Sequence, residues 1–264
     1  MLKEDLNMNK EIKSERKNRS VYIEDGKCYK VFDVGYDKSD ILSEALVQSL
    51  VEKTGLNVPA ILEMTMIDGK WAIVTEAVEG DTLEELMDKH PEKEDEYLNR
   101  FVDIQIDMLS KRCPELIKHK DKMNRKMYSA DFLSATMRYD LNRQIEGKPR
   151  HNCLCHGDYN PSNVIINSKD EAYIVDWSHA TQGNEEADAA RTYMLFIVAG
   201  KNKLARKYID LFCEKSGCKQ KDILNWLPIL ATSQATKKRE YEWEALHKII
   251  FMDRKALEEL YEQQ

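Results

Sequence analysis

The chain has 264 residues, of which 42% are hydrophobic and 33% are charged, and its formal net charge is −7 at pH 7. A chain of this length exceeds what a single hydrophobic core usually supports, which favours two lobes. The acidic balance argues against a nucleic-acid-binding protein, because such proteins present a basic surface. It still permits one phosphorylated ligand in a locally basic cleft.

The cysteines and the lack of long apolar runs indicate a cytoplasmic protein. There is no CxxC pair, and Cys153 and Cys155 lack a second Cys or His pair at zinc-finger spacing. Reduced structural thiols are therefore favoured over a metal site. No apolar run approaches the ~18 residues of a membrane span, and the first residues lack the apolar stretch of a signal peptide. We therefore expect no membrane contact.

Two hairpins are predicted in the N-terminal part of the chain. Residues 19–33, RSVYIEDGKCYKVFD, and residues 61–76, ILEMTMIDGKWAIVTE, each contain two β-rich runs around an Asp-Gly pair. Asp-Gly between alternating segments is the strongest short-range hairpin signal. We expect the two hairpins to form a small antiparallel sheet.

A helix is predicted between the hairpins, over residues 39–55. Ser39 or Asp40 can cap its start, and Gly55 can end it. The residues expected on its apolar face are Ile41, Leu42, Ala45, Leu46, Ser49 and Leu50. The sheet is therefore expected to carry one helix.

The character of the chain changes after a short hinge near residues 77–81. Thr82 and Glu85 form a capping-box pattern, which predicts a helix start. The further predicted elements are helices at about 94–112 and 129–145, strands at 164–166 and 172–175, and helices from about residue 185 onward. This pattern predicts an α+β fold with a small sheet part and a larger, mostly helical part.

Residues 156–177, HGDYNPSNVIINSKDEAYIVDW, combine polar side chains with a short predicted hairpin. Asn163 stands where the hairpin begins and Asp176 where it ends, so both side chains are expected at one end of two paired strands. Two oxygen ligands at one place suit Mg²⁺ that carries nucleotide phosphates. Asp158, on the preceding loop, can accept the proton of an attacking hydroxyl or align it.

Each of these residues has a simpler interpretation when taken alone. Asp158 and Asn163 are typical turn residues. Asp176 can be a strand-ending residue, and His156 a hydrogen-bonded structural histidine. The combination of His-Gly-Asp, a step to Asn and a hairpin that ends in Asp-Trp favours phosphoryl transfer.

HGDYNPSNVII and IVDW resemble the catalytic and metal-binding signature of the aminoglycoside phosphotransferase/choline kinase family, the small-molecule relatives of protein kinases. The resemblance implies a protein-kinase-like two-lobe fold. Residues 1–78 would form the nucleotide-binding lobe, a small antiparallel sheet with one helix. Residues 79–264 would form the mostly helical lobe that binds the substrate. The expected cofactors are ATP and Mg²⁺, and the expected acceptor is a hydroxyl group of a small molecule.

The resemblance also implies roles for individual residues. Asp158 corresponds to the catalytic carboxylate, and Asn163 and Asp176 correspond to the Mg²⁺ ligands. Lys30 matches the lysine that contacts the α- and β-phosphates, and Glu44 matches its ion-pair partner. Lys30 can equally be a solvated strand lysine, and Glu44 a solvated helix residue.

Two further segments match the family. TEAVEG corresponds to the hinge, where backbone groups of Glu76, Ala77 and Val78 would meet the adenine. In GNEEADAAR, Asp188 would brace the catalytic loop, together with His156. Asp188 can also be a helix N-terminal charge favoured by the helix dipole.

The segment expected to cover the phosphates departs from the family pattern. Residues 13–20 read KSERKNRS and contain no glycine, although a close backbone approach to phosphate favours glycine. Its basic side chains and Ser20 can bind phosphate instead. The alternative is a catalytically weak or inactive nucleotide-binding regulatory relative. A protein kinase is less favoured, because Asp-Trp replaces Asp-Phe-Gly and no Ala-Pro-Glu follows.

The identity of the acceptor stays open at this stage. Residues 239–248, REYEWEALHK, place acidic and aromatic side chains together, which suits a cationic amine. The favoured alternative is an amphipathic helix with a solvated acidic face and aromatic residues in the core. Trp177, Tyr159 and His179 flank the motif and can also shape an acceptor site.

Overall fold

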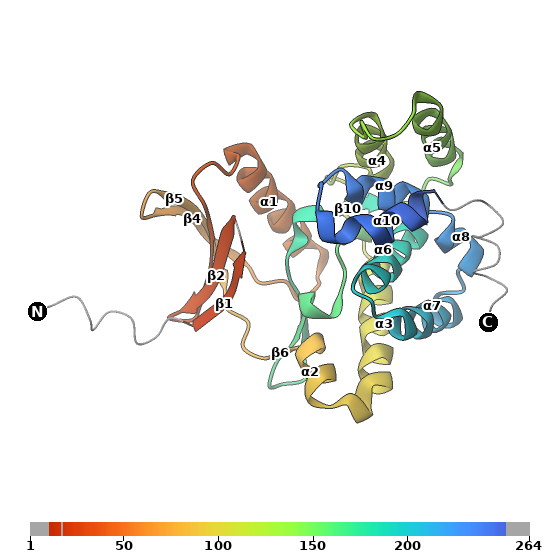
Figure 1. The fold of residues 1–264 in the computed structure, drawn as a ribbon. Helices are drawn as coiled ribbons and strands as arrows, with labels where there is room; N and C mark the ends of the chain where they lie inside the picture. The colour runs from red at the N-terminus through yellow and green to blue at the C-terminus, as the bar shows by residue number, and fades with distance from the viewer. Residues whose placement is uncertain (1–10, 17, 252–264) are drawn as a thin grey trace, which may run out of the picture. The chain divides into compact units, whose positions relative to one another are not determined.

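The computed structural model describes residues 11–16 and 18–251 (Figure 1). The described residues form two compact units. The first, which we call the sheet unit, contains the residues up to 89 and residues 161–179; the second, the helical unit, contains residues 90–160 and those from 180 onward. The predicted assignment of lobes to residues 1–78 and 79–264 stays a prediction.

The sheet unit contains a five-stranded antiparallel sheet in the order β1-β2-β3-β5-β4. Its strands are β1 (Glu11–Arg16), β2 (Arg19–Glu24), β3 (Lys27–Phe32), β4 (Ile61–Ile67) and β5 (Lys70–Glu76). Both predicted hairpins are confirmed, and their Asp-Gly turns have positive φ at each central residue, as a type I′ turn requires. The segment 13–20, expected to form a loop over the phosphates, instead lies largely in β1 and β2. Lys17, within this segment, is outside the described residues.

Helix α1 (Lys38–Val51) packs against one face of this sheet. Its Ile41 and Ala45 form a cluster with Phe32 of β3 and Ile73 of β5, which alternate with residues facing the other side. Asp37 caps the helix by accepting a hydrogen bond from the Ser39 N–H at 2.7 Å. The predicted caps, Ser39 and Asp40, are therefore wrong by two and three residues.

The inner face of α1 also differs from the prediction. Leu42 and Leu46 are 46% and 59% exposed, whereas Glu44 is buried. The stripe that faces the sheet is therefore centred nearer residues 41, 44 and 45 than the apolar pattern indicated. A short 3₁₀ turn, Glu52–Thr54, follows the helix, and Gly55 ends it with φ +80°.

A second, three-stranded sheet in this unit holds the motif hairpin. It is formed by β6 (Asp81–Thr82), β8 (Val164–Ile166) and β9 (Ala172–Ile174) in the order β6-β8-β9. Helix α2 (Leu83–Lys89) follows β6, and its predicted capping box is confirmed: the Thr82 N–H donates to Glu85 at 2.7 Å and the Glu85 N–H to Thr82 Oγ1 at 3.1 Å. A Cβ at Gly80 would lie 2.1 Å from the Ile166 carbonyl oxygen, so only glycine fits there.

The helical unit surrounds a short two-stranded sheet, β7 (Cys153–Cys155) paired with β10 (Thr181–Gly183). Its helices are α3 (Glu94–Ser110), α4 (His119–Tyr128), α5 (Ala135–Gly147), α6 (Glu185–Val198), α7 (Asn202–Ser216), α8 (Gln220–Leu224), α9 (Leu227–Ala235) and α10 (Glu240–Ile250). The predicted helix at 129–145 is shifted, because Ser134 caps α5 by accepting from the Met137 N–H. Helix α4 was not expected, since its sequence is polar apart from His119, Met123 and Met127, which are buried.

An aromatic cluster fills the centre of the helical unit. Phe101 of α3 stacks on Tyr159 at 4.3 Å between ring centroids and meets Tyr208 of α7 and Phe196 of α6. The Tyr159 hydroxyl donates to the Phe101 carbonyl at 2.8 Å, so its polar end is satisfied inside the core. Within residues 11–16 and 18–251, no helix has the length and apolar composition to cross a lipid bilayer.

Candidate functional site

The sheet unit brings together three of the residues singled out in the sequence. Lys30 lies in the middle of β3, paired with Val21 of β2 and Ile73 of β5. Its ammonium group contacts the Glu44 carboxylate of α1 and donates to Asp176 Oδ1 at 2.9 Å. The three side chains are largely shielded from water, so these pairings fix the lysine head group more firmly than surface ion pairs do.

Asp176 follows strand β9 in a left-handed backbone conformation. Its φ is +63°, a region that L-residues rarely adopt and that aspartate tolerates better than most. Such conformations persist where the surrounding structure holds them, and they concentrate at functional sites. Here the turn out of β9 leaves the Asp176 carboxylate against Lys30.

A second cation, not singled out by number in the sequence, also holds Asp176. Arg19, the first residue of β2, donates from Nη2 to Asp176 Oδ2 at 3.1 Å. The side chain is one of those in the glycine-free segment 13–20. Both oxygens of Asp176 therefore accept from cationic groups, a charge arrangement that also suits bound phosphate.

Asn163 lies at the same end of the motif hairpin as Asp176, directly before the first strand. It ends a short 3₁₀ turn, Pro161–Asn163, directly before β8, and is 9% exposed. Its carbonyl accepts from the Val175 N–H at 3.0 Å, which ties the residue to the one preceding Asp176. The hairpin thus holds an amide and a carboxylate at one end, and oxygen donors of this kind are the ligands Mg²⁺ prefers.

The predicted hinge begins at Glu76, the last residue of β5, and continues through Ala77 and Val78. The N–H of Glu76 donates to the Ala60 carbonyl at 3.0 Å, and the N–H of Ala77 donates to the Gly26 carbonyl at 3.1 Å. Two of the three hinge N–H groups are therefore used within the sheet unit. Val78 is half-buried, and within residues 11–16 and 18–251 its N–H has no backbone hydrogen bond of this kind.

The helical unit holds the loop of the His-Gly-Asp motif. Arg191 of α6 donates from Nη2 to Asp158 Oδ1 at 3.0 Å and from Nε to the Gly157 carbonyl at 3.2 Å. Arg191 is 7% exposed, so its guanidinium is nearly desolvated and the ion pair orients the Asp158 carboxylate. Sequence reasoning missed Arg191, although it lies in the quoted segment GNEEADAAR.

The same face of α6 holds the rest of this loop. The Asp188 carboxylate accepts from the Gly157 N–H at 2.8 Å and from Gln105 Nε2 at 3.1 Å, and Thr192 donates to the Tyr159 carbonyl at 2.9 Å. Burial raises the pKa of Asp188, and the Gly157 hydrogen bond opposes that rise. Residues 188, 191 and 192 share one helix face, because they are three and four positions apart.

His156 lies fully buried at the start of the loop. Its Nδ1 accepts from the Asp158 N–H at 3.2 Å, and its ring meets Tyr159 edge-on at 6.0 Å. The histidine therefore packs inside the loop that carries Asp158. Tyr159 and Trp177 are also fully buried. This burial argues against the prediction that their rings shape an acceptor site.

The acidic and aromatic helix predicted near residues 239–248 is α10. Its Glu242 is 4% exposed and accepts from Gln234 at 2.6 Å and Arg239 at 3.0 Å. Tyr241, in contrast, is 79% exposed. The helix is amphipathic as favoured, but Glu242 faces the interior, and both aromatic residues, Tyr241 and the 42% exposed Trp243, lie at the surface and not in the core as predicted.

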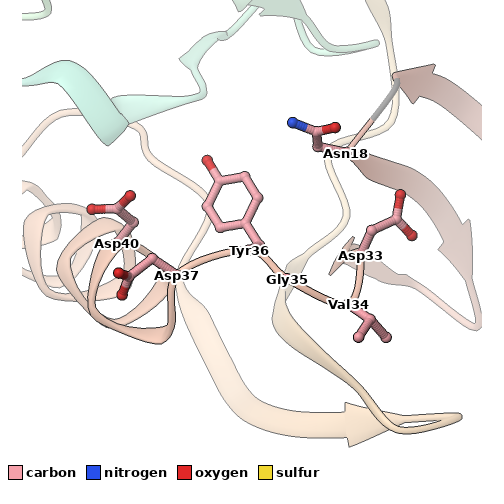
Figure 2. Close-up of a pocket in the computed structure, with 7 residues that line it drawn as sticks. All are labelled: Asn18, Asp33, Val34, Gly35, Tyr36, Asp37 and Asp40. Atoms are coloured by element: carbon pink, nitrogen blue, oxygen red, sulfur yellow. The ribbon is translucent and has the colours of Figure 1, made fainter.

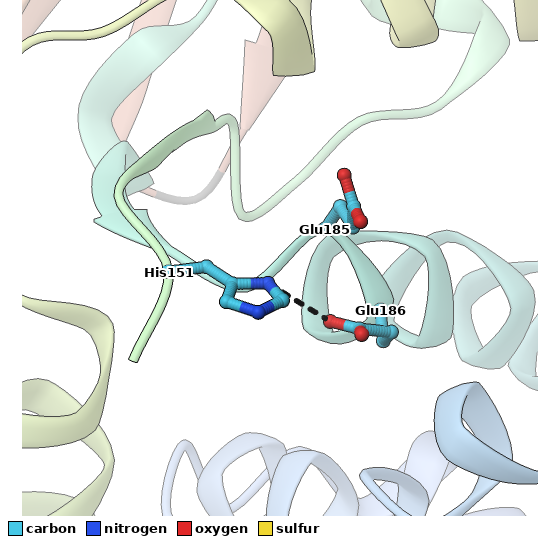
Figure 3. Close-up of side chains that lie close together, drawn as sticks. All are labelled: His151, Glu185 and Glu186. Carbon is cyan, nitrogen blue, oxygen red and sulfur yellow. Dashed lines mark ion pairs between the residues drawn. The ribbon is translucent and has the colours of Figure 1, made fainter. Parts of the chain in front are cut away.

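Two other features are less suited to chemistry. An open pocket near the start of α1 is lined by Asn18, Asp33, Val34, Gly35, Tyr36, Asp37 and Asp40. Its aspartates lie on either side of Tyr36 and would repel phosphate (Figure 2). In the helical unit, the half-buried His151, Glu185 and Glu186 could share a cation, but the histidine Nδ1 already faces Glu186 Oε2 at 3.8 Å (Figure 3).

Comparisons with known proteins place the chain among phosphotransferases. The profile of the phosphotransferase enzyme family (APH) matches residues 9–219. A search of the curated proteins gives no match. Solved structures with the same fold include a thermostable mutant of aminoglycoside phosphotransferase APH(4)-Ia, which is 14% identical with a TM-score of 0.66 over 92% of this chain and 94% of that one.

A choline/ethanolamine kinase family protein and a choline kinase are also similar in structure. A choline/ethanolamine kinase family protein from Mesorhizobium loti is 12% identical, with a TM-score of 0.63 over 98% of this chain and 93% of that one. Choline kinase LicA from Streptococcus pneumoniae is 14% identical, with a TM-score of 0.62 over 94% of each chain. At these identities the likeness concerns the fold, and it confirms the predicted kinase-like α+β class.

Proposed function

The chain belongs to the phosphotransferase enzyme family, as the motif over residues 156–177 predicted, and we propose that it transfers the γ-phosphate of ATP to a hydroxyl group of a small molecule. The observation that carries the proposal is the cluster of Lys30, Glu44 and Asp176 in the sheet unit. A strand lysine held between a helix glutamate and the motif aspartate is the arrangement that kinase chemistry uses to bind ATP phosphates.

In this proposal Lys30 and Arg19 bind phosphate oxygens, and Glu44 holds Lys30 in place. Both cations already pair with a carboxylate, so they are placed to pair with phosphate. Asp176 and Asn163 would hold Mg²⁺, which neutralises phosphate charge when bound. The donor set fits this ion, because it offers a carboxylate and an amide at one end of a short hairpin.

Adenine recognition is assigned to the hinge, Glu76 to Val78. Since the N–H groups of Glu76 and Ala77 donate to Ala60 and Gly26, the N–H available to the base in this assignment is that of Val78. The relative APH(4)-Ia has been crystallised with ADP and with AMP-PNP, which supports a nucleotide as the donor.

Asp158 is assigned as the group that aligns the acceptor hydroxyl and takes its proton. Arg191 donates to its Oδ1. Asp188 and Thr192 hydrogen-bond the backbone of the residues on either side, Gly157 and Tyr159. The carboxylate is therefore oriented before any substrate binds, which lowers the entropic cost of reaching the reactive geometry. His156 would support the same loop from inside.

The second candidate is a nucleotide-binding relative without turnover. It is favoured by the glycine-free segment, where β1 and β2 leave side chains such as Arg19 to contact phosphate in place of a glycine-rich backbone. Against it, the chain keeps Lys30, Asp158, Asn163 and Asp176, and a degenerate enzyme has no need to keep the complete set.

The test is release of ADP from Mg-ATP across a panel of hydroxyl compounds, with calorimetric binding of Mg-ATP measured in parallel. The panel contains aminoglycosides, choline, ethanolamine, amino-alcohols, sugars and hydroxy acids. A substrate whose turnover disappears in Asp158→Asn supports the kinase. Tight Mg-ATP binding without turnover across the panel supports the regulatory relative, and loss of both overturns the proposal.

A further inference from the structure

The surroundings of Asp158 in the helical unit are rich in positive charge. Arg191 pairs with Asp158 at 3.0 Å and is almost completely shielded from water. Helices α4 and α6 both pack against α9, which brings two lysines toward this pair: Lys122 on α4 and Lys237 just beyond the end of α9. We call Lys122, Arg191 and Lys237 the basic cluster.

The charges of the basic cluster act on one another. The pKa of Lys122 is lowered to about 8 by burial, then by Lys237, Arg191 and Lys126, while Asp158 raises it. The pKa of Lys237 is lowered to about 8 by loss of hydration, then by Arg191, while Asp158 raises it. Burial is the largest cause for both lysines. Among the charges, Lys237 and Arg191 each outweigh Asp158 at Lys122, and Arg191 outweighs Asp158 at Lys237.

Among the described residues, Asp158 and Glu242 are the acids whose charges act most on these lysines. Asp158 is one carboxylate beside three cations, and it is already paired with Arg191. Glu242, which also acts on Lys237, accepts from Arg239 at 3.0 Å and from Gln234. Its charge is thus largely matched by Arg239, so the charges of the residues described by the structure leave the basic cluster net positive.

We propose that the acceptor of this kinase carries an anionic group, a carboxylate or a phosphate, beside its hydroxyl, and that Lys122, Arg191 and Lys237 bind that group. The inference rests on the proposed function. An anion would lower the mutual repulsion of the three cations and gain hydrogen bonds from them. A cationic aminoglycoside or choline would be repelled by the same charges.

Binding in this way would place the hydroxyl for transfer. The acceptor oxygen bonds to the γ-phosphorus as the bond from that phosphorus to the β–γ bridging oxygen breaks. ADP leaves with that electron pair, and the hydroxyl proton passes to Asp158. Anchoring a second group of the acceptor fixes the direction of attack, so the anion contributes to kcat as well as to affinity.

The first experiment compares matched acceptors that differ by one charged group. L-serine is set against ethanolamine, L-homoserine against 3-aminopropan-1-ol, and D-glycerate against ethylene glycol, each with Mg-ATP and with the Asp158→Asn protein as control. We expect kcat/KM to be at least about tenfold higher for the acid of a pair. Preferential turnover of choline, ethanolamine or an aminoglycoside would overturn the anionic acceptor and leave the kinase standing.

The second experiment needs no turnover. D-glycerate and inorganic phosphate are titrated by calorimetry into the protein saturated with Mg-AMP-PNP, which occupies the nucleotide-binding residues. We expect the double variant Lys122→Gln, Lys237→Gln to bind at least about tenfold more weakly. The control is Lys203→Gln, an exposed lysine on α7, which should bind normally. Thermal unfolding of all variants checks the fold.

These measurements separate the two proposals. Anion binding that depends on the lysines but is followed by no transfer of phosphate would support the anionic site and contradict the kinase. Unchanged anion binding in the double variant, or no anion binding by the folded wild-type protein, would overturn the anionic site.

Discussion

Asp176 in the sheet unit and Asp158 in the helical unit are both carboxylates paired with an arginine, but they are held in different ways. Asp176 receives Lys30 and Arg19 from two strands of the five-stranded sheet. Asp158 receives Arg191 from a helix whose neighbouring positions also hold the loop backbone. One carboxylate sits among separate side chains, whereas the other belongs to a braced loop.

This difference matches the tasks assigned to the two groups. Lys30 and Arg19 form ion pairs with Asp176. A phosphate can pair with the two cations, and a metal ion with the carboxylate, in place of these ion pairs. The Asp158 loop is held at Gly157, Asp158 and Tyr159, so its carboxylate is placed before substrate arrives. A site for a charged ligand can rearrange, while a group that handles a proton needs a fixed position.

The largest expected effect comes from Asp158→Asn. An amide cannot take the hydroxyl proton, so we expect kcat to fall by ~10²–10⁴ while Mg-ATP affinity stays within about twofold. Steady-state kinetics and calorimetry on the same preparation check both parts. The matched control is Asp140→Asn, an exposed aspartate on α5. Near-normal turnover in Asp158→Asn would remove Asp158 from the chemistry.

Asp176→Ala tests the other carboxylate. Loss of a metal ligand should abolish most of the gain in ATP affinity that Mg²⁺ provides, by about tenfold to a hundredfold. ATP is titrated with Mg²⁺ and with EDTA in both proteins, so that the wild-type protein is its own control. If Mg²⁺ improved ATP binding equally in the variant, Asp176 would not be a ligand.

Arg19→Gln separates the phosphate contact from the metal site. Removing a charged donor to phosphate should weaken nucleotide binding by about tenfold or more, since a hydrogen bond to a charged group contributes ~1.5–3 kcal/mol. Arg19→Lys keeps the charge and should recover part of the affinity. Tighter binding in Arg19→Gln would contradict the assignment, because it would mean that Arg19 competes with the metal for Asp176.

Local signals predicted much of the fold. Each Asp-Gly hairpin and the Thr82–Glu85 capping box involve residues close in the sequence, and the structure confirms all three. The inner face of α1 was misjudged because Glu44 is drawn inward by its pairing with Lys30, while Leu42 and Leu46 face outward. Apolar periodicity cannot show an ion pair that buries an acid.

The candidate site could also be predicted in part, where its residues lie close together in the sequence. Arg191 lies three residues after Asp188 in a predicted helix, so its place on the same face could have been inferred. Arg19 could not have been paired with Asp176, because 157 residues separate them and the β2–β3 register decides the contact. The basic cluster likewise depends on the packing of α4, a helix that its polar sequence did not predict.

The smallest expected effect is a change with pH in the KM for the acceptor, which tests the residues proposed to bind the acceptor separately from those proposed to bind the nucleotide. Lys122 and Lys237 have pKa values lowered to about 8, so both are cationic below that pH and become neutral above it. An anionic acceptor needs the cationic form. Its KM should therefore rise by about three- to fivefold between pH 7 and pH 8.5, in step with the loss of charge from one lysine.

The charged groups that set this titration are Lys237, Arg191, Lys126 and Asp158 around Lys122, and Arg191, Asp158, Arg239 and Glu242 around Lys237. The control is the double variant Lys122→Arg, Lys237→Arg, because guanidinium groups stay charged throughout this range. Its KM for the acid should stay flat from pH 7 to pH 8.5, whereas that of the wild-type protein rises. An equal rise in both proteins would assign the pH dependence to groups outside the basic cluster, and the anion would then owe its binding to Arg191 alone or to another site.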